Sequence, residues 1–249
     1  MGDTASVAVS RTPWWLEFLV LLALLAVYLL IRHFAFHKLS LAIANGRLLL
    51  AVEHHFGVAP EVSLNRWLTS CTWLGKVASG FYDLAALAIT PPVAIFIWFR
   101  GRPVSEVARN EMVISLLIAF AVFAIFPVAP PRLVDGQFIS IGGQGTSVGS
   151  WYLDYFDQLD QLAALPSIHV ISACWCFSSI WKLAASRIAK RIAVLIGGGY
   201  IAVTSFVVMA TANHYLLDVL AGIGTATLAV VVVGWLFPLS LRFKEAKIV

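Results

Sequence analysis

The segment "TANHYLLDVLAGIGTATLAVVVVGWL", residues 211–236, joins two ionisable side chains to a long apolar run. A membrane-spanning helix needs about 20 predominantly apolar residues, and this run is long enough. It therefore predicts a transmembrane helix. His214 and Asp218 stand where that helix begins. Ionisable side chains are costly in a bilayer, so their presence indicates a functional site.

The composition of the whole chain agrees with a membrane location. Of its 249 residues, 60% are hydrophobic and 12% are charged, whereas a soluble domain carries about 25% charged residues. We therefore expect an integral membrane protein. Basic residues retained on the cytoplasmic side explain the net charge of +4, so no nucleic-acid partner is expected. The three cysteines are interpreted as small apolar fillers, since their spacing suits neither a disulfide framework nor a zinc site.

Six apolar segments are candidates for membrane spans, and we expect an all-α protein in which they form one bundle. Residues 1–81 would hold the first span and an amphipathic segment, 82–240 a helical core, and 241–249 a basic cytoplasmic tail. The predicted spans are Trp14–Ile31, Tyr82–Phe99, Met112–Pro130, Ser167–Ala184, Ile192–Thr211 and Tyr215–Leu239.

The distribution of lysine and arginine predicts the orientation in the cell membrane. Basic residues cluster after the second span, after the fourth span and in the tail, which places these parts in the cytoplasm. The loop after the third span has one basic residue, Arg132, and several aspartates, so this loop and the His214 turn face outward. Residues 32–81 carry five basic residues despite their expected external position. Within them, the amphipathic segment "LSLAIANGRLLLAVEHHFG" (39–57) is expected to lie along the membrane surface.

Three polar patches, residues 127–136, 165–173 and 211–222, are predicted to converge at the outer surface. His214 and Asp218 are four residues apart and share a helix face. A carboxylate there can fix the imidazole tautomer and leave the other nitrogen as a nucleophile. The alternative is a structural hydrogen bond that holds the start of the helix.

His169 and Arg132 complete the predicted constellation. His169 lies just inside the fourth span, after Pro166 and a possible helix-capping Ser167. The guanidinium of Arg132 suits a tetrahedral oxyanion. Packing of His169 and snorkelling of Arg132 to lipid headgroups are the alternatives. Two histidines and an arginine suit phosphoryl transfer through a covalent histidine, without a metal or another cofactor.

The segment "VEHHF" (52–56) offers a weaker signal for a metal site. Neighbouring helix residues point about 100° apart, so one ion would contact Glu53 and only one of the two histidines. No metal site is expected here.

"PSIH" (166–169) followed by "NHYLLD" (213–218) resembles the second and third signatures of the type 2 phosphatidic acid phosphatase superfamily. The resemblance implies a phosphatase-like six-helix core within residues 82–240. It also implies His214 as the nucleophile, Asp218 as its orienter, His169 as acid and then base, and Ser167 as a phosphate donor.

Two further stretches resemble the inositol phosphorylceramide synthase-like branch of that superfamily: "FPVAPPR" (126–132) and "HYLLDV" (214–219). The usual first signature, a lysine spaced before Arg-Pro, is absent. Arg102–Pro103 has no such lysine and falls on the predicted cytoplasmic side. The Ser-Arg that normally precedes the third-signature histidine is also absent.

The sequence thus favours a lipid phosphatase that hydrolyses a phosphate monoester or diphosphate at the outer face, with a phosphohistidine intermediate. Arg132, Ser167 and Tyr215 are the expected substrate-binding residues, although Tyr215 could instead belong to the interfacial aromatic belt. A phosphotransferase that uses an alcohol such as inositol would need the same residues. A non-catalytic transporter or scaffold is the third alternative. The expected partners are the bilayer and a lipid phosphate.

Overall fold

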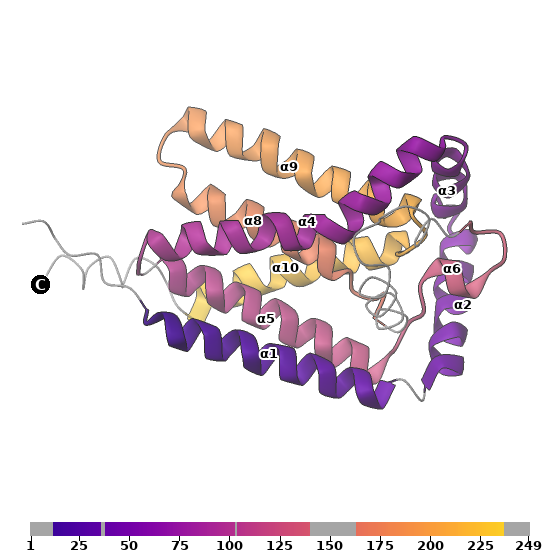
Figure 1. The fold of residues 1–249 in the computed structure, drawn as a ribbon, viewed down its shortest axis with the longest axis horizontal. Coiled ribbons are helices and arrows are strands. Elements are labelled where there is room, and N and C mark those ends of the chain that lie inside the picture. Colours follow the sequence, from indigo (N-terminus) through magenta and orange to yellow (C-terminus); the bar gives the residue numbers. More distant parts are fainter. Residues whose placement is uncertain (1–11, 36–37, 103, 140–162, 237–249) are drawn as a thin grey trace, which may run out of the picture.

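A computed structural model describes residues 12–35, 38–102, 104–139 and 163–236, which are helices and their connections (Figure 1). The basic tail and most of the loop before residue 163 lie outside the described residues. In the described part the only β-type contact is an isolated bridge between Val128 and Ala163. The helices are α1 (Trp14–Ala35), α2 (Leu39–His55), α3 (Glu61–Thr69), α4 (Thr72–Phe99), α5 (Val104–Ile125), α6 (Pro131–Val134), α8 (Ile168–Leu183), α9 (Arg187–Ala210) and α10 (Leu216–Leu236).

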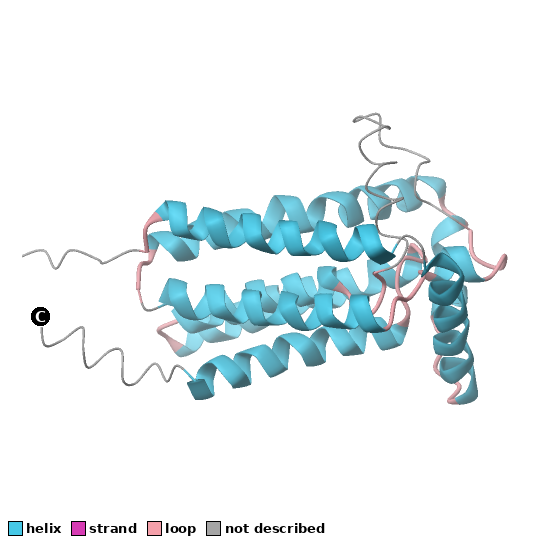
Figure 2. Ribbon diagram, turned by 90° about the horizontal axis from the view of Figure 1, so that it is seen from below, coloured by secondary structure: helices cyan, strands magenta, loops and turns pink. Residues whose placement is uncertain are grey.

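Long helices run side by side and form the bundle, as Figures 1 and 2 show. Five described helices are long and apolar enough to cross a membrane, namely α1, α4, α5, α9 and α10. Large apolar side chains such as Leu195, Val231 and Trp235 are exposed on the bundle. Exposed apolar surface of this kind is expected where a protein faces lipid.

The fourth predicted span, Ser167–Ala184, corresponds to α8, which has 16 residues. At 1.5 Å per residue it is about 24 Å long, less than the ~30 Å hydrocarbon core. The six predicted spans therefore correspond to five spanning-length helices and one shorter apolar helix. Shortly before α8, Ala163 forms an isolated bridge with Val128, and the amide of Ala164 donates to the carbonyl of Val128 at 3.1 Å.

The boundaries of several helices differ from the prediction. Helix α4 begins at Thr72, ten residues earlier than expected, and continues through Pro91 and Pro92. Helix α5 ends at Ile125 and not at Pro130. Prolines at 127, 130 and 131 explain this early end, since proline lacks an amide proton and disfavours helix in the preceding residue.

Helices α2 and α3 lie across one end of the bundle, roughly perpendicular to the long helices (Figure 1). Segment 39–57 is thus helical over most of its length, as predicted. Gly46 allows α2 to approach closely: a Cβ there would lie 2.7 Å from the hydroxyl of Tyr215 and 2.8 Å from the carbonyl of Ala129. Leu49 and Leu50 of α2 pack in one buried cluster with Val128 and Tyr215. This packing holds α2 against the end of the bundle where α10 begins.

Candidate active site

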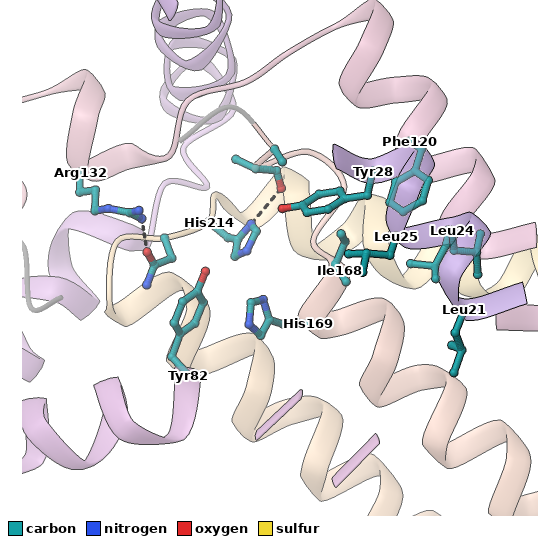
Figure 3. Close-up of a pocket in the computed structure, with 14 residues that line it drawn as sticks. Leu21, Leu24, Leu25, Tyr28, Tyr82, Phe120, Arg132, Ile168, His169 and His214 are labelled. Atoms are coloured by element: carbon teal, nitrogen blue, oxygen red, sulfur yellow. Dashed lines mark hydrogen bonds between the residues drawn. The ribbon is translucent and has the colours of Figure 1, made fainter. Parts of the chain in front are cut away.

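A cavity of about 370 Å³ opens at this end of the bundle (Figure 3). Arg132, Tyr82, His169 and His214 lie on one side of it, and apolar side chains of α1, α5 and α8 lie on the other. Its lining residues are Leu21, Leu24, Leu25, Tyr28, Tyr82, Leu116, Phe120, Arg132, Ala163, Ala164, Ile168, His169, Asn213 and His214.

His214 lies in the tight turn between α9 and α10. Ala212 has a φ of 57°, in the left-handed region, which reverses the chain. The amides of Asn213 and His214 then both donate to the carbonyl of Val208, at 3.1 Å and 3.0 Å. The side chain of His214 is 6% exposed, so the turn holds a nearly buried imidazole at the cavity.

The hydrogen bond of His214 Nδ1 fixes the imidazole tautomer. Nδ1 lies 2.9 Å from the carbonyl oxygen of Ala164 (Figure 3). A carbonyl can only accept, so Nδ1 carries the proton and donates it. In the neutral ring Nε2 then keeps its lone pair. The tautomer is thus fixed as the sequence analysis expected, but by the Ala164 carbonyl as the closer partner and not by Asp218. The role of His214 as a nucleophile stays a prediction.

Asp218 is the more distant partner of that imidazole. Its Oδ2 lies 3.4 Å from His214 Nδ1 and accepts the amide of Tyr215 at 2.9 Å. A carboxylate three residues into a helix that accepts the N-cap amide forms half of a capping box. Asp218 therefore caps α10 and lies beside the imidazole, while Ala164 is the closer acceptor.

His169 occupies the first turn of α8. Its ring stacks on Tyr82 of α4, with a centroid distance of 4.3 Å. The ring centroids of His169 and His214 are 5.9 Å apart, and both rings line the cavity. The two histidines expected to meet are therefore adjacent, with space for a ligand beside them.

Arg132 is anchored to the His214 turn. Its guanidinium donates to Oδ1 of Asn213, and its backbone amide donates to the carbonyl of Ala212 at 3.1 Å. These contacts join the segment after α5 to the turn before α10. The residues of the three predicted patches therefore lie together around one cavity.

Ser167 and Tyr215 are placed differently from the expected substrate-binding residues. Ser167 is fully buried, and its hydroxyl caps α8 by accepting the amide of Val170. The capping prediction is confirmed. The Tyr215 hydroxyl donates to the carbonyl of Ala129 at 3.0 Å. Neither residue is among those that line the cavity, because each is buried in packing behind it.

Sequence reasoning missed several residues around the site. Ala164, whose carbonyl fixes the His214 tautomer, has no side-chain signal in the sequence. Tyr82 and Asn213 become recognisable only once α4 and the turn before α10 meet the cavity. The apolar wall formed by α1 was not anticipated either.

Comparison with known families agrees with this arrangement. The model of the PAP2 superfamily matches residues 47–232, well over half of the chain. The protein therefore belongs to the PAP2 superfamily, a family that indicates phosphatase-type chemistry on phosphoric esters. No curated protein and no solved structure matches the chain.

Proposed function

We propose that this protein is a metal-independent lipid phosphatase of the cell membrane that hydrolyses a lipid phosphate monoester or diphosphate through a phosphohistidine on His214. The observation that carries the proposal is the hydrogen bond from His214 Nδ1 to Ala164, because it leaves Nε2 as the nucleophile. His169 and Arg132 border the same cavity.

In the first step Nε2 of His214 attacks phosphorus, and the bond between phosphorus and the lipid oxygen breaks. Protonated His169 gives its proton to the departing oxygen. The guanidinium of Arg132 stabilises the charge on the other phosphoryl oxygens. The carboxylate of Asp218, 3.4 Å from Nδ1, stabilises the positive charge that His214 acquires.

In the second step water replaces the lipid alcohol. Neutral His169 takes a proton from the water as its oxygen attacks the phosphohistidine. The phosphorus–nitrogen bond breaks, phosphate leaves, and His169 is again protonated. His214 returns to its starting tautomer, with Nδ1 still bonded to Ala164.

The apolar wall of the cavity supports a lipid substrate. A second cavity of about 620 Å³ lies between α1, α4 and α5 and shares Leu21 and Leu24 with the first. The lining of the two cavities extends along α1 from Tyr28 to Trp14, about 21 Å at 1.5 Å per residue. This apolar path suits a hydrocarbon chain whose phosphate end lies at the histidines.

The charge distribution supports a site on the non-cytoplasmic face. Arg102 directly precedes α5 and Arg109 lies near its start, whereas Phe120, near its other end, lines the cavity. Lys182 lies at the end of α8, whereas His169 lies at its beginning. These three basic residues therefore lie at the end of the bundle away from the histidines, and clustered basic residues prefer the cytoplasm. Arg47 of α2 and Arg66 of α3 lie at the histidine end. Membership of the inositol phosphorylceramide synthase-like branch stays a prediction.

Measurement of phosphate release in the presence of EDTA tests the proposal. The purified protein in detergent is given phosphatidic acid and, separately, a polyprenyl phosphate, beside the His214→Ala variant. We expect release that survives EDTA and disappears in the variant. Release that EDTA abolishes, or that the variant retains, would contradict the mechanism. Transfer of the phosphoryl-containing group to an added alcohol, without release to water, would instead identify the phosphotransferase.

A further inference from the structure

Three carboxyl groups cap the amino end of α10, and they come from three different helices. Asp218 of α10 accepts the amide of Tyr215 at 2.9 Å, Glu61 of α3 accepts that of Leu216 at 2.6 Å, and Glu53 of α2 accepts that of Leu217 at 2.7 Å. The first amides of a helix have no partner within the helix. Here three consecutive amides each have their own carboxylate.

Glu53 and Glu61 are buried without a balancing cation. Their side chains are 1% and 0% exposed, and in the described part of the chain no lysine or arginine forms an ion pair with either. The second oxygen of each, Oε2, has no hydrogen-bonding donor among the described residues. Buried charges are normally paired, so two adjacent uncompensated carboxylates would be strongly unfavourable.

One proton shared between Glu53 and Glu61 removes one of the two unfavourable buried charges. The two carboxyl groups are close enough for each to affect the pKa of the other, yet two ionised carboxylates cannot donate a hydrogen bond. Burial raises the pKa of Glu53 to about 8, and the charge of Glu61 raises it as well. Burial also raises the pKa of Glu61. The titratable groups that face the pair are Asp218 of α10 and Tyr215, which directly precedes α10, and neither supplies positive charge.

We propose that Glu53 and Glu61 share one proton and together clamp the amino end of α10, so that they act as positioning residues for His214. The positive end of the helix dipole favours the one negative charge that the pair retains. The positioning role rests on the proposed function, because it assumes that His214 is the nucleophile.

The contacts of Glu53 and Glu61 affect the position of His214 through the backbone. Leu216 and Leu217 are the first residues of α10, and only Tyr215 separates them from His214. If the clamp is lost, the start of α10 is free to shift, and the imidazole moves relative to the Ala164 carbonyl. Displacements of about 1 Å at a catalytic group can lower the rate about 100-fold. Helices α2 and α3, which lie outside the bundle, thus act on the geometry of the active site.

Infrared spectroscopy tests the shared proton without any assay of activity. The parent protein at neutral pH should show the carbonyl band of a protonated carboxyl group, and Glu53→Gln and Glu61→Gln should each remove it. The matched control is Glu106→Gln, a buried glutamate paired with Arg102 at the other end of the bundle, which should retain the band. A band that survives both glutamine variants, or that only Asp218→Asn removes, would overturn the proposal.

Kinetics then test the positioning role. Glutamine at position 53 keeps an acceptor for the Leu217 amide and can donate to Glu61, so Glu53→Gln should keep kcat within about threefold of the parent. Glu53→Ala should lower kcat about 10- to 100-fold with little change in KM, since the residue does not line the cavity. Equal kcat values for the two variants would overturn the positioning role.

The two proposals fail in distinguishable ways. If the parent shows the band but releases no phosphate from any lipid, the proposed function and the positioning role both fail. If His214-dependent release is observed but neither glutamine variant changes the band, only the shared proton fails.

Discussion

At the scale of single residues, the carbonyl of Ala164 and the carboxyl group of Asp218 both contact Nδ1 of His214, and we propose a different role for each. The carbonyl, 2.9 Å from Nδ1, sets the tautomer. The carboxyl group of Asp218, 3.4 Å away, caps α10, and we propose that it also stabilises the positive charge that His214 acquires. Because these tasks are separate, changing Asp218 should affect the rate without destroying the nucleophile.

The Asp218→Asn variant tests this division. The amide oxygen of asparagine can still accept from Tyr215, and Ala164 still holds the tautomer, but the negative charge is gone. We expect kcat to fall about 10- to 100-fold, a loss of roughly 1.4–2.8 kcal/mol of transition-state stabilisation. Measurement of kcat beside His214→Ala checks this. Complete inactivity equal to that of His214→Ala would show that Asp218, and not Ala164, sets the tautomer.

Arg132 is predicted to act on the phosphoryl group in the transition state. Arg132→Ala should lower kcat by about 100-fold or more, and Arg132→Lys should recover only part of this, because lysine lacks the planar pair of donors. Steady-state kinetics provide the measurement. Arg102→Ala is the control and should change kcat less than twofold, since Arg102 pairs with Glu106 far from the cavity. An active Arg132→Ala would mean that the phosphate binds elsewhere.

At the scale of helices, the contact between α2 and the start of α10 depends on Gly46. A methyl group there would meet the hydroxyl of Tyr215 and the carbonyl of Ala129 at less than 3 Å, and the carbonyl is part of the backbone. Gly46→Ala should destabilise the protein by about 1–3 kcal/mol, seen as a lower Tm in detergent. Gly224→Ala on α10, where a methyl group has open space, is the control. An unchanged Tm in Gly46→Ala would contradict the close packing of α2.

Apolar run length predicted the long helices well, because a bilayer requires continuous apolar segments of nearly fixed length. Apolar run length predicted α8 less well, since a 16-residue apolar helix is shorter than the hydrocarbon core, and its surroundings decide whether it crosses the membrane. The ends of α4 and α5 were misplaced: α4 begins ten residues before its predicted apolar span, and prolines ended α5 before its apolar run finished.

The histidines and Arg132 could be found from the sequence because polar residues at the edges of apolar runs are conspicuous. Glu53 could not be interpreted in the same way. Its partners, Glu61 and the amide of Leu217, become neighbours only when α2 and α3 fold across the bundle. Ala164 is a similar case, because its contribution comes from a backbone carbonyl 50 residues before His214.

At the scale of the whole molecule, the raised pKa of Glu53 makes stability depend on pH. Its pKa is about 8 in the folded protein and 4.5 ordinarily. Between these values the folded protein holds a proton that the unfolded chain has released, so the free energy of unfolding falls as pH rises. Below about 4.5 this contribution is fully present, and above about 8 it has been lost.

Thermal unfolding in detergent tests whether stability falls as pH rises. The Tm of the parent protein should fall by a few degrees as pH rises through that window, and Glu53→Gln should show a flatter dependence, because an amide does not titrate there. Glu106→Gln should follow the parent. A parent Tm that rises with pH across the window, or an equal slope in Glu53→Gln, would contradict the assignment.

The central claim is that His214 becomes phosphorylated during turnover. The most direct measurement is rapid quenching of the enzyme with a lipid whose phosphate is isotopically labelled, followed by mass spectrometry of its peptides. We predict a label on His214 that is stable to alkali and lost in acid, and that is absent from His214→Ala. Labelled phosphate released at the full rate without any label on His214 would contradict the account.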